Sequence, residues 1–237
     1  MHQLEPRHYL AASPMPPLND LEKALTNVYL KIFREIKKEP YYPNNFYHVF
    51  QKYNKLVYDN TRSAIQQSVI FGGEKVNRLF KTQPYITQAD LDLIKKNSEA
   101  QTASFWRKVQ LDIMRKREQM QLTGGADIEY DEEGNPIPPP DLDMSAYLLS
   151  VAVASLFGSF ADSTLSKTIE LADTIPQKPM VQWSAILDSK TCDRLPDFSE
   201  GCSQRNGKIY EIDDPELQIH MPGSVHAFCR CQLLTIL

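Results

Sequence analysis

The four cysteines of the chain all lie in its last part, at positions 192, 202, 229 and 231, and no cysteine precedes Cys192. His226 stands three residues before Cys229. Thiols gathered in this way serve one local purpose, either metal binding or cross-linking. A structural zinc site takes four Cys or His ligands, so this segment offers one more candidate than such a site needs. We predict a structural zinc ion held by four of five residues: Cys192, Cys202, His226, Cys229 and Cys231.

The spacing of the last two cysteines supports joint ligation. Cys229 and Cys231 are two residues apart, so in an extended strand both side chains point to the same face. Arg230 then points to the opposite face, where we predict that it forms a structural ion pair. Packed free thiols and disulfides are the alternatives to a metal. The N-terminus lacks the basic and apolar regions of a secretory signal, so we expect folding in a reducing cytosol, which disfavours disulfides.

Catalysis is not expected from this cluster. His226 with Cys229 or Cys231 would offer a nucleophile and a base, but no acidic orienting residue or oxyanion loop stands in a recognisable relation to them. Asp188 and Glu211 are conceivable bases for a zinc-dependent hydrolase, which is the enzymatic alternative. The chain has no phosphate-binding glycine motif. We therefore predict a protein that is not an enzyme.

The residues before this module have the periodicity of long helices. Apolar residues at helical spacing predict helices around 19–39, from 45 to a Gly72-Gly73 end, from a capping box at Thr87–Asp90 to about 122, and over about 142–174. Three short strands are expected after residue 180. The fold class is α+β, with a mainly helical N-terminal body and a small Cys/His-containing α+β module. The expected organisation is an irregular arm at 1–17, a helical body at 18–175 with an acidic, proline-rich loop at 124–141, and the module at 180–237.

One segment is apolar enough to be weighed as a membrane span. No charged residue occurs from Met144 to Ala161, which is close to the shortest length that crosses a bilayer. Several serines interrupt it, and acidic residues rather than lysine or arginine flank it. A buried helix of the body is the expected structure, and insertion of residues 144–161 into a membrane is the alternative.

The charge balance argues against a general nucleic-acid binder. The formal net charge is −4 at pH 7, so the chain as a whole has no field that attracts polyanions. Basic residues do gather on the later half of the third helix, at Arg107, Lys108 and 115–117. We interpret them as a solvated helix face, with a nucleic-acid groove as the alternative.

The module after residue 180 combines a tryptophan-led strand, an Asp-x-x-Thr-Cys turn, a Gly-Lys strand and a closing Cys-Arg-Cys. The residues of this pattern are Trp183, Asp188, Thr191, Cys192, Gly207, Lys208, Ile209, Tyr210, Pro222, His226, Cys229, Arg230 and Cys231. In this pattern the module resembles the C-terminal domain of the phage Mu F-like minor head proteins, the phage head morphogenesis family. Leu195 stands where the family has a second cysteine, with Cys202 as its displaced counterpart, and Ala227 stands where proline is common.

This resemblance implies a structural component of a tailed phage virion. Such a protein would be present in few copies in the head, assembled in the host cytoplasm, and associated with the portal protein and the inner capsid. It would assist head morphogenesis, genome packaging or DNA delivery, and packaged DNA is a further expected partner. The alternatives are a zinc-dependent hydrolase or effector, and an ejected protein that inserts its 144–161 helix into the host membrane.

Overall fold

The computed structural model describes residues 16–39, 45–123, 144–187, 192, 193, 195, 200–223, 226 and 228–237. The acidic loop predicted at 124–141 and the arm predicted at 1–17 lie outside these residues, except that Pro16 and Pro17 already belong to the first helix. Asp188, Thr191 and Ala227 of the resemblance also lie outside them.

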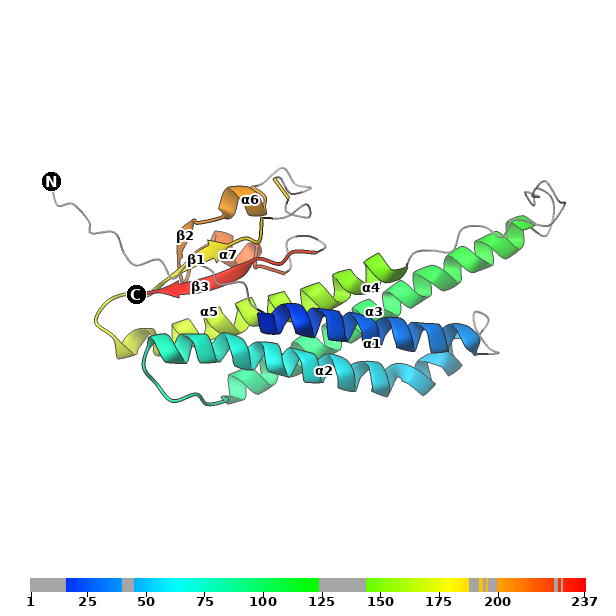
Figure 1. Cartoon of the computed structure of the whole chain (residues 1–237), viewed down its shortest axis with the longest axis horizontal. Helices are drawn as coiled ribbons and strands as arrows, with labels where there is room; N and C mark the ends of the chain where they lie inside the picture. Colours follow the sequence, from blue (N-terminus) through cyan, green and yellow to red (C-terminus); the bar gives the residue numbers. More distant parts are fainter. Residues whose placement is uncertain are drawn as a thin grey trace.

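The N-terminal body is a bundle of long helices, as predicted. Figure 1 shows them lying lengthwise beside one another, with the end of α3 reaching beyond the others. The last helix of the bundle runs back against α3 and contains one π-helical turn and a short 3-10 end. The elements are α1 (Pro16–Lys38), α2 (Phe46–Leu79), α3 (Gln88–Thr123), α4 (Met144–Val153), η1 (Ala154–Gly158), α5 (Ser159–Leu171) and η2 (Ala172–Thr174).

Aromatic residues from three helices pack together in the bundle. Tyr29 of α1 lies 5.1 Å from Phe105 of α3, measured between ring centroids, and Phe105 meets Trp106 edge-on at 5.3 Å. Phe46 and Phe50 of α2 pack on Trp106. The predicted capping box of α3 is confirmed, because the Asp90 backbone N–H donates to Thr87 Oγ1 and the Thr87 N–H donates to Asp90 Oδ2.

The glycine pair of α2 does not end the helix, so that prediction was wrong. The helix continues through Gly72 and Gly73 to Leu79 because the glycines lie at a close contact with α5. A Cβ atom on Gly72 would stand 2.7 Å from the Phe160 carbonyl oxygen. Ser163 Oγ, also from α5, donates to the Val69 carbonyl of α2 at 2.8 Å. The small residues thus allow two helix backbones to approach and bond.

Helix α4–α5 is buried in this bundle, which agrees with the expected core helix. The run Met144–Thr174 is long and apolar enough to cross a membrane by length and composition, but 61% of its most apolar window is buried inside the protein. Core helices of water-soluble domains pass the same test, so this feature favours burial in the bundle.

The predicted C-terminal strands form a small antiparallel sheet in the order β2-β1-β3. In Figure 1 this sheet lies along one side of α5. Val181 pairs with Tyr210, and Trp183 pairs with Leu233. Alternate residues of β1 are buried, as expected for a sheet with one covered face. The elements are β1 (Met180–Ser184), α6 (Cys202–Arg205), β2 (Ile209–Glu211), α7 (Pro215–Ile219) and β3 (Gln232–Ile236).

Helix α5 joins the two parts of the protein. Ala161 is buried among the sheet residues and Leu165 packs beside it, whereas Phe160 of the same helix belongs to the bundle core. The hydroxyls of Thr168 in α5 and Thr235 in β3 are 2.7 Å apart. One helix therefore supplies side chains to both hydrophobic cores.

An ion pair also connects the two parts. Arg230 donates from Nε to Glu22 Oε2 at 2.7 Å and from Nη2 to Glu22 Oε1 at 2.5 Å. The two side chains are 14% and 10% exposed, so water screens this pair only weakly. The predicted structural role of Arg230 is confirmed, and its partner lies in α1 at the other end of the sequence.

The glycine contact predicts different effects for two neighbouring substitutions. In Gly72→Ala the new methyl group meets backbone, so we expect a loss of about 1–3 kcal/mol in unfolding free energy. In Gly73→Ala the nearest atom is 3.6 Å away, so the substitution should be neutral or stabilising by up to about 1 kcal/mol. Thermal unfolding of both variants measures this. Equal melting temperatures for the two variants would contradict the close contact of Gly72 with α5.

The Arg230–Glu22 pair predicts that Arg230→Ala destabilises the protein. The substitution leaves a mostly buried carboxylate without its bidentate partner, which costs about 2–3 kcal/mol after allowance for partial exposure. Lys178→Ala is the control, since the Lys178–Glu211 pair is more than half exposed and should matter little. Urea unfolding compares the two. An Arg230→Ala variant as stable as Lys178→Ala would contradict the prediction.

Candidate metal centre

All five predicted ligand residues gather at one end of the sheet. Cys192 lies in the connection between β1 and α6, and Cys202 is the first residue of α6. His226 follows α7, and the last two cysteines immediately precede β3. Cys202, Cys229 and Cys231 are buried, whereas Cys192 and His226 are half-buried. Four chain segments thus converge on one small volume.

The ligand atoms form two overlapping groups that share Cys202. One group contains Cys192, Cys202 and His226, and the other contains Cys202, Cys229 and Cys231. Within each group, the possible ligand atoms all lie within 4.8 Å of one another. The structure therefore has a Cys/His cluster that could hold a metal ion, and Cys202 is its central residue.

The distance between the Cys202 and Cys229 sulfurs is that of two ligands on one metal ion. The Sγ atoms of Cys202 and Cys229 are 3.7 Å apart, and His226 Nε2 is 3.1 Å from Cys202 Sγ. Zinc–sulfur bonds of about 2.3 Å at tetrahedral angles place two sulfurs about 3.8 Å apart. A disulfide would need about 2.0 Å. The four cysteines are free thiols in this structure.

Backbone N–H groups support two of the sulfurs. Cys202 donates its N–H to Cys192 Sγ at 3.3 Å, and Gly223 donates its N–H to Cys229 Sγ at 3.3 Å. Such donors around a metal-binding thiolate stabilise its charge and fix its orientation. Sequence reasoning missed Gly223, although the Pro222-Gly223 pair is a turn signal. Gly223 has a φ of 82°, which favours glycine. A Cβ atom at this position would also stand only 2.3 Å from Gly158 N, so no larger residue fits.

Contacts within the cluster shift the pKa values of the thiols in opposite directions. Hydrogen bonds to Cys229 and Cys231, with burial, raise the pKa of the Cys202 thiol. Hydrogen bonds from Cys202 and Cys231 lower the pKa of Cys229 far below its ordinary value, although burial opposes them. Cys229 is therefore the sulfur whose thiolate form these contacts favour. A divalent cation would be attracted to that thiolate and would displace the remaining protons.

The predicted strand geometry of the last two cysteines needs one adjustment. Their side chains do reach the same group of ligands, but β3 begins only at Gln232. Phe228 has a φ of 68°, so the chain turns immediately before Cys229. A turn followed by an extended segment, rather than a paired strand, presents both sulfurs.

The fold and the cluster define a class of protein: a small antiparallel sheet with Cys and His ligands at one end, packed on a helical bundle. Residues 161–234 match the family described as Phage Mu protein F like protein. This segment is a phage Mu protein F-like domain, as the resemblance over 180–237 predicted. Searches of curated proteins and of solved structures gave no match to the chain.

The match begins within α5, earlier than the resemblance seen in the sequence. The structure gives the physical reason, since Ala161, Leu165 and Thr168 of α5 contact the sheet or its core. From the sequence alone, α5 continues the apolar helix of the bundle and has no boundary signal. The match therefore includes most of the helix on which the sheet rests.

The shared position of Cys202 predicts that its replacement abolishes metal binding. The wild-type protein should hold about one zinc ion per chain. Cys202→Ser should hold none and unfold at a lower temperature, because metal binding free energy contributes to folding. Elemental analysis and thermal unfolding with and without a chelator measure both effects. Ser203→Ala is the control. The Ser203 hydroxyl donates to the Cys192 carbonyl oxygen and to Asp193 Oδ1, and not to a sulfur.

Two results would contradict this prediction. One is a wild-type protein purified without zinc that neither binds it nor changes its melting temperature when zinc is added. The other is a Cys202→Ser variant that keeps the metal. Affinity should also rise with pH, because protons compete with the metal for the sulfurs.

Proposed function

We propose that this chain is a structural minor head protein of a tailed bacteriophage, located in the virion head and associated with the portal. The observation that carries the proposal is the Mu F-like domain at residues 161–234 with its Cys/His cluster. In this role the protein assists head morphogenesis, genome packaging or DNA delivery. The portal protein and the inner capsid are its proposed partners.

The number of candidate ligands favours a structural metal ion over a catalytic one. A catalytic zinc ion keeps a coordination position open for water, whereas a structural ion is closed by four protein ligands. Here five donors are available for four positions, and three of them are buried cysteines. Four of Cys192, Cys202, His226, Cys229 and Cys231 would bind the ion and brace the loops at the end of the sheet. We propose accordingly that the protein is not an enzyme.

The helical body offers the surface for the proposed assembly. Its helices are long, and long helices present extended faces to partner proteins. The Glu22–Arg230 pair and the shared helix α5 hold this body against the Mu F-like domain. A partner bound to either part would therefore meet a rigid unit.

Quantification in purified phage heads tests the proposal. We expect a low, fixed copy number per head, and recovery of the protein with the portal when heads are taken apart. Phage that lack the protein should form heads with defects in assembly, packaging or delivery. Absence of the protein from both heads and portal complexes would contradict the structural role.

An ejected protein that inserts into the host membrane is a second candidate, favoured by the apolar run Met144–Thr174. Insertion would require α4–α5 to leave the bundle, at the cost of the core that it fills. The full-length protein mixed with liposomes of anionic phospholipid distinguishes the two candidates. Partition into the liposomes would support insertion, and recovery in the aqueous fraction would exclude it under those conditions.

A further inference from the structure

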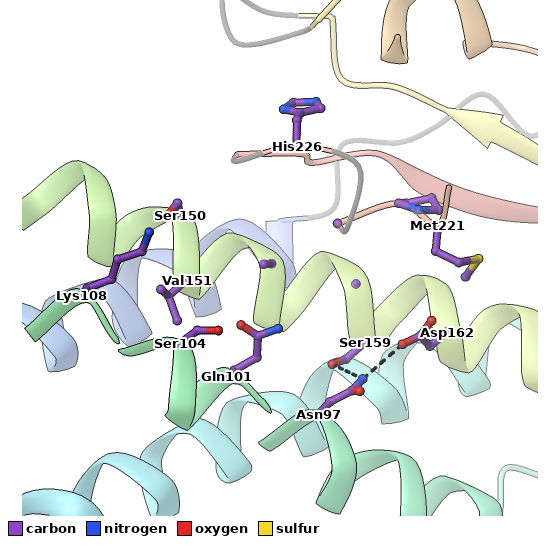
Figure 2. Close-up of a pocket in the computed structure, with 14 residues that line it drawn as sticks. Asn97, Gln101, Ser104, Lys108, Ser150, Val151, Ser159, Asp162, Met221 and His226 are labelled. Atoms are coloured by element: carbon purple, nitrogen blue, oxygen red, sulfur yellow. Dashed lines mark hydrogen bonds between the residues drawn. The ribbon is translucent and has the colours of Figure 1, made fainter. Parts of the chain in front are cut away.

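A polar groove runs between the helical body and the Mu F-like domain. Its volume is about 420 Å³, and it is bounded by α3, the α4–α5 helix, residues 221–223 and His226. Figure 2 shows Asn97, Gln101, Ser104 and Lys108 following α3 along one side, with Met221 and His226 on the opposite side. The imidazole of His226 points away from the helices, and its Nε2 lies 3.1 Å from Cys202 Sγ.

Two contacts fix how the helices line this groove. At one end, the Asn97 amide donates to Ser159 Oγ at 3.0 Å and to Asp162 Oδ2 at 3.2 Å. At the other end, Lys108 Nζ lies 5.0 Å from the centroid of the Tyr147 ring. The two helices are antiparallel, so every turn of α3 between these ends faces a turn of α4–α5 (Figure 1).

The residues of α3 that face the groove are polar, and those opposite them at its middle are small. Polar side chains recur along α3, at Asn97, Gln101, Ser104 and Lys108. On α4–α5 the residues at the middle levels are Ala154 and Gly158, which keep the groove open. The π-helical turn spans these two residues, and such turns often occur at functional sites. Gly223 presses against Gly158 and supports the loop above the groove.

The length and chemistry of the groove suit a polypeptide. The rise of α3 from Asn97 to Lys108 is about 16 Å, which equals about five residues of extended chain. An extended peptide exposes alternating N–H and C=O groups, and amide side chains can satisfy both kinds. The Gln101 amide makes no side-chain hydrogen bond within the described part of the chain and is half-buried in the groove.

The charges at the two ends of the groove would orient a bound segment. Lys108 has no carboxylate at ion-pair distance among the described residues, so its end of the groove is positive. The other end holds Asp162, which accepts from Asn97 and can accept from a further N–H. Burial raises the pKa of this carboxyl, although the Asn97 hydrogen bond opposes that effect. An acidic residue or a C-terminal carboxylate therefore fits at Lys108.

We propose that this groove binds an extended segment of a partner protein, about five residues long, with a carboxylate against Lys108. The bound segment contacts the bundle on one side and residues 221–223 with His226 on the other. Its binding therefore holds the two parts of the protein together. This inference names a partner surface for the proposed head protein and rests on that function. Binding is nevertheless measured on the purified chain, so failure of the groove and absence from virions are separate results.

Selection from a random heptapeptide library on the purified chain tests the groove. Peptides with an acidic residue near one end should be enriched. Their affinity, measured by fluorescence polarisation, should fall about tenfold or more in Gln101→Trp, whose indole fills the groove. Gln67→Trp is the matched control, because Gln67 is an exposed residue of α2 that does not line the groove. That variant should bind as the wild type does.

A charge reversal makes the test specific. Lys108→Glu should weaken the acidic peptides by about tenfold or more and should favour variants of the same peptides with lysine in place of the acidic residue. Circular dichroism verifies that each variant is folded. The proposal is overturned if no peptide is enriched. It is also overturned if the enriched peptides bind Gln101→Trp as tightly as the wild type, or if Lys108→Glu leaves the acidic preference unchanged.

Discussion

The two parts of this protein depend on the position of α5 between them. On one side, α5 packs so closely on α2 that a Cβ on Gly72 would stand 2.7 Å from the Phe160 carbonyl oxygen. On the other side, Ala161 and Leu165 pack with the residues of the sheet. A helix that fills two cores cannot shift relative to one without losing contacts in the other, because protein interiors are densely packed. The sheet, its loops and the cysteines are therefore positioned by the bundle.

The cluster of cysteines and His226 extends this arrangement to the loops. The strands of the sheet are short, and the candidate ligands lie at the start of α6 and in the connections before α6 and after α7. A metal bound by residues from several of these loops would tie them to each other and to the start of β3. The Gly223 turn connects the cluster to the π-helical turn of the bundle, through its N–H bond to Cys229 and its contact with Gly158. The Cys/His cluster, the contact between the two parts and the shape of the polar groove are thus physically linked.

Much of the fold was predictable because its signals are local. The apolar periodicity of the long helices, the Thr87–Asp90 capping box and the three short strands were all recognised, and all are present. The ligand residues were recognised as well, since cysteine is rare in the chain and its positions cluster. The error at Gly72-Gly73 has a clear cause. A glycine pair is a local helix-ending signal, and only the packing of α5 shows that these glycines serve a close helix contact instead.

Residue types and spacing were enough to indicate the helical body, the small sheet, the candidate ligands and the Mu F-like family, because each depends on neighbours along the chain. The tertiary structure decided what depends on distant residues. It assigned Glu22 as the partner of Arg230, 208 residues away, and it placed α5 in both cores. It also made Cys202 the residue common to both ligand groups and formed a groove from three separate segments. Periodicity records which face of an element is buried, but it carries no information on which other element covers that face.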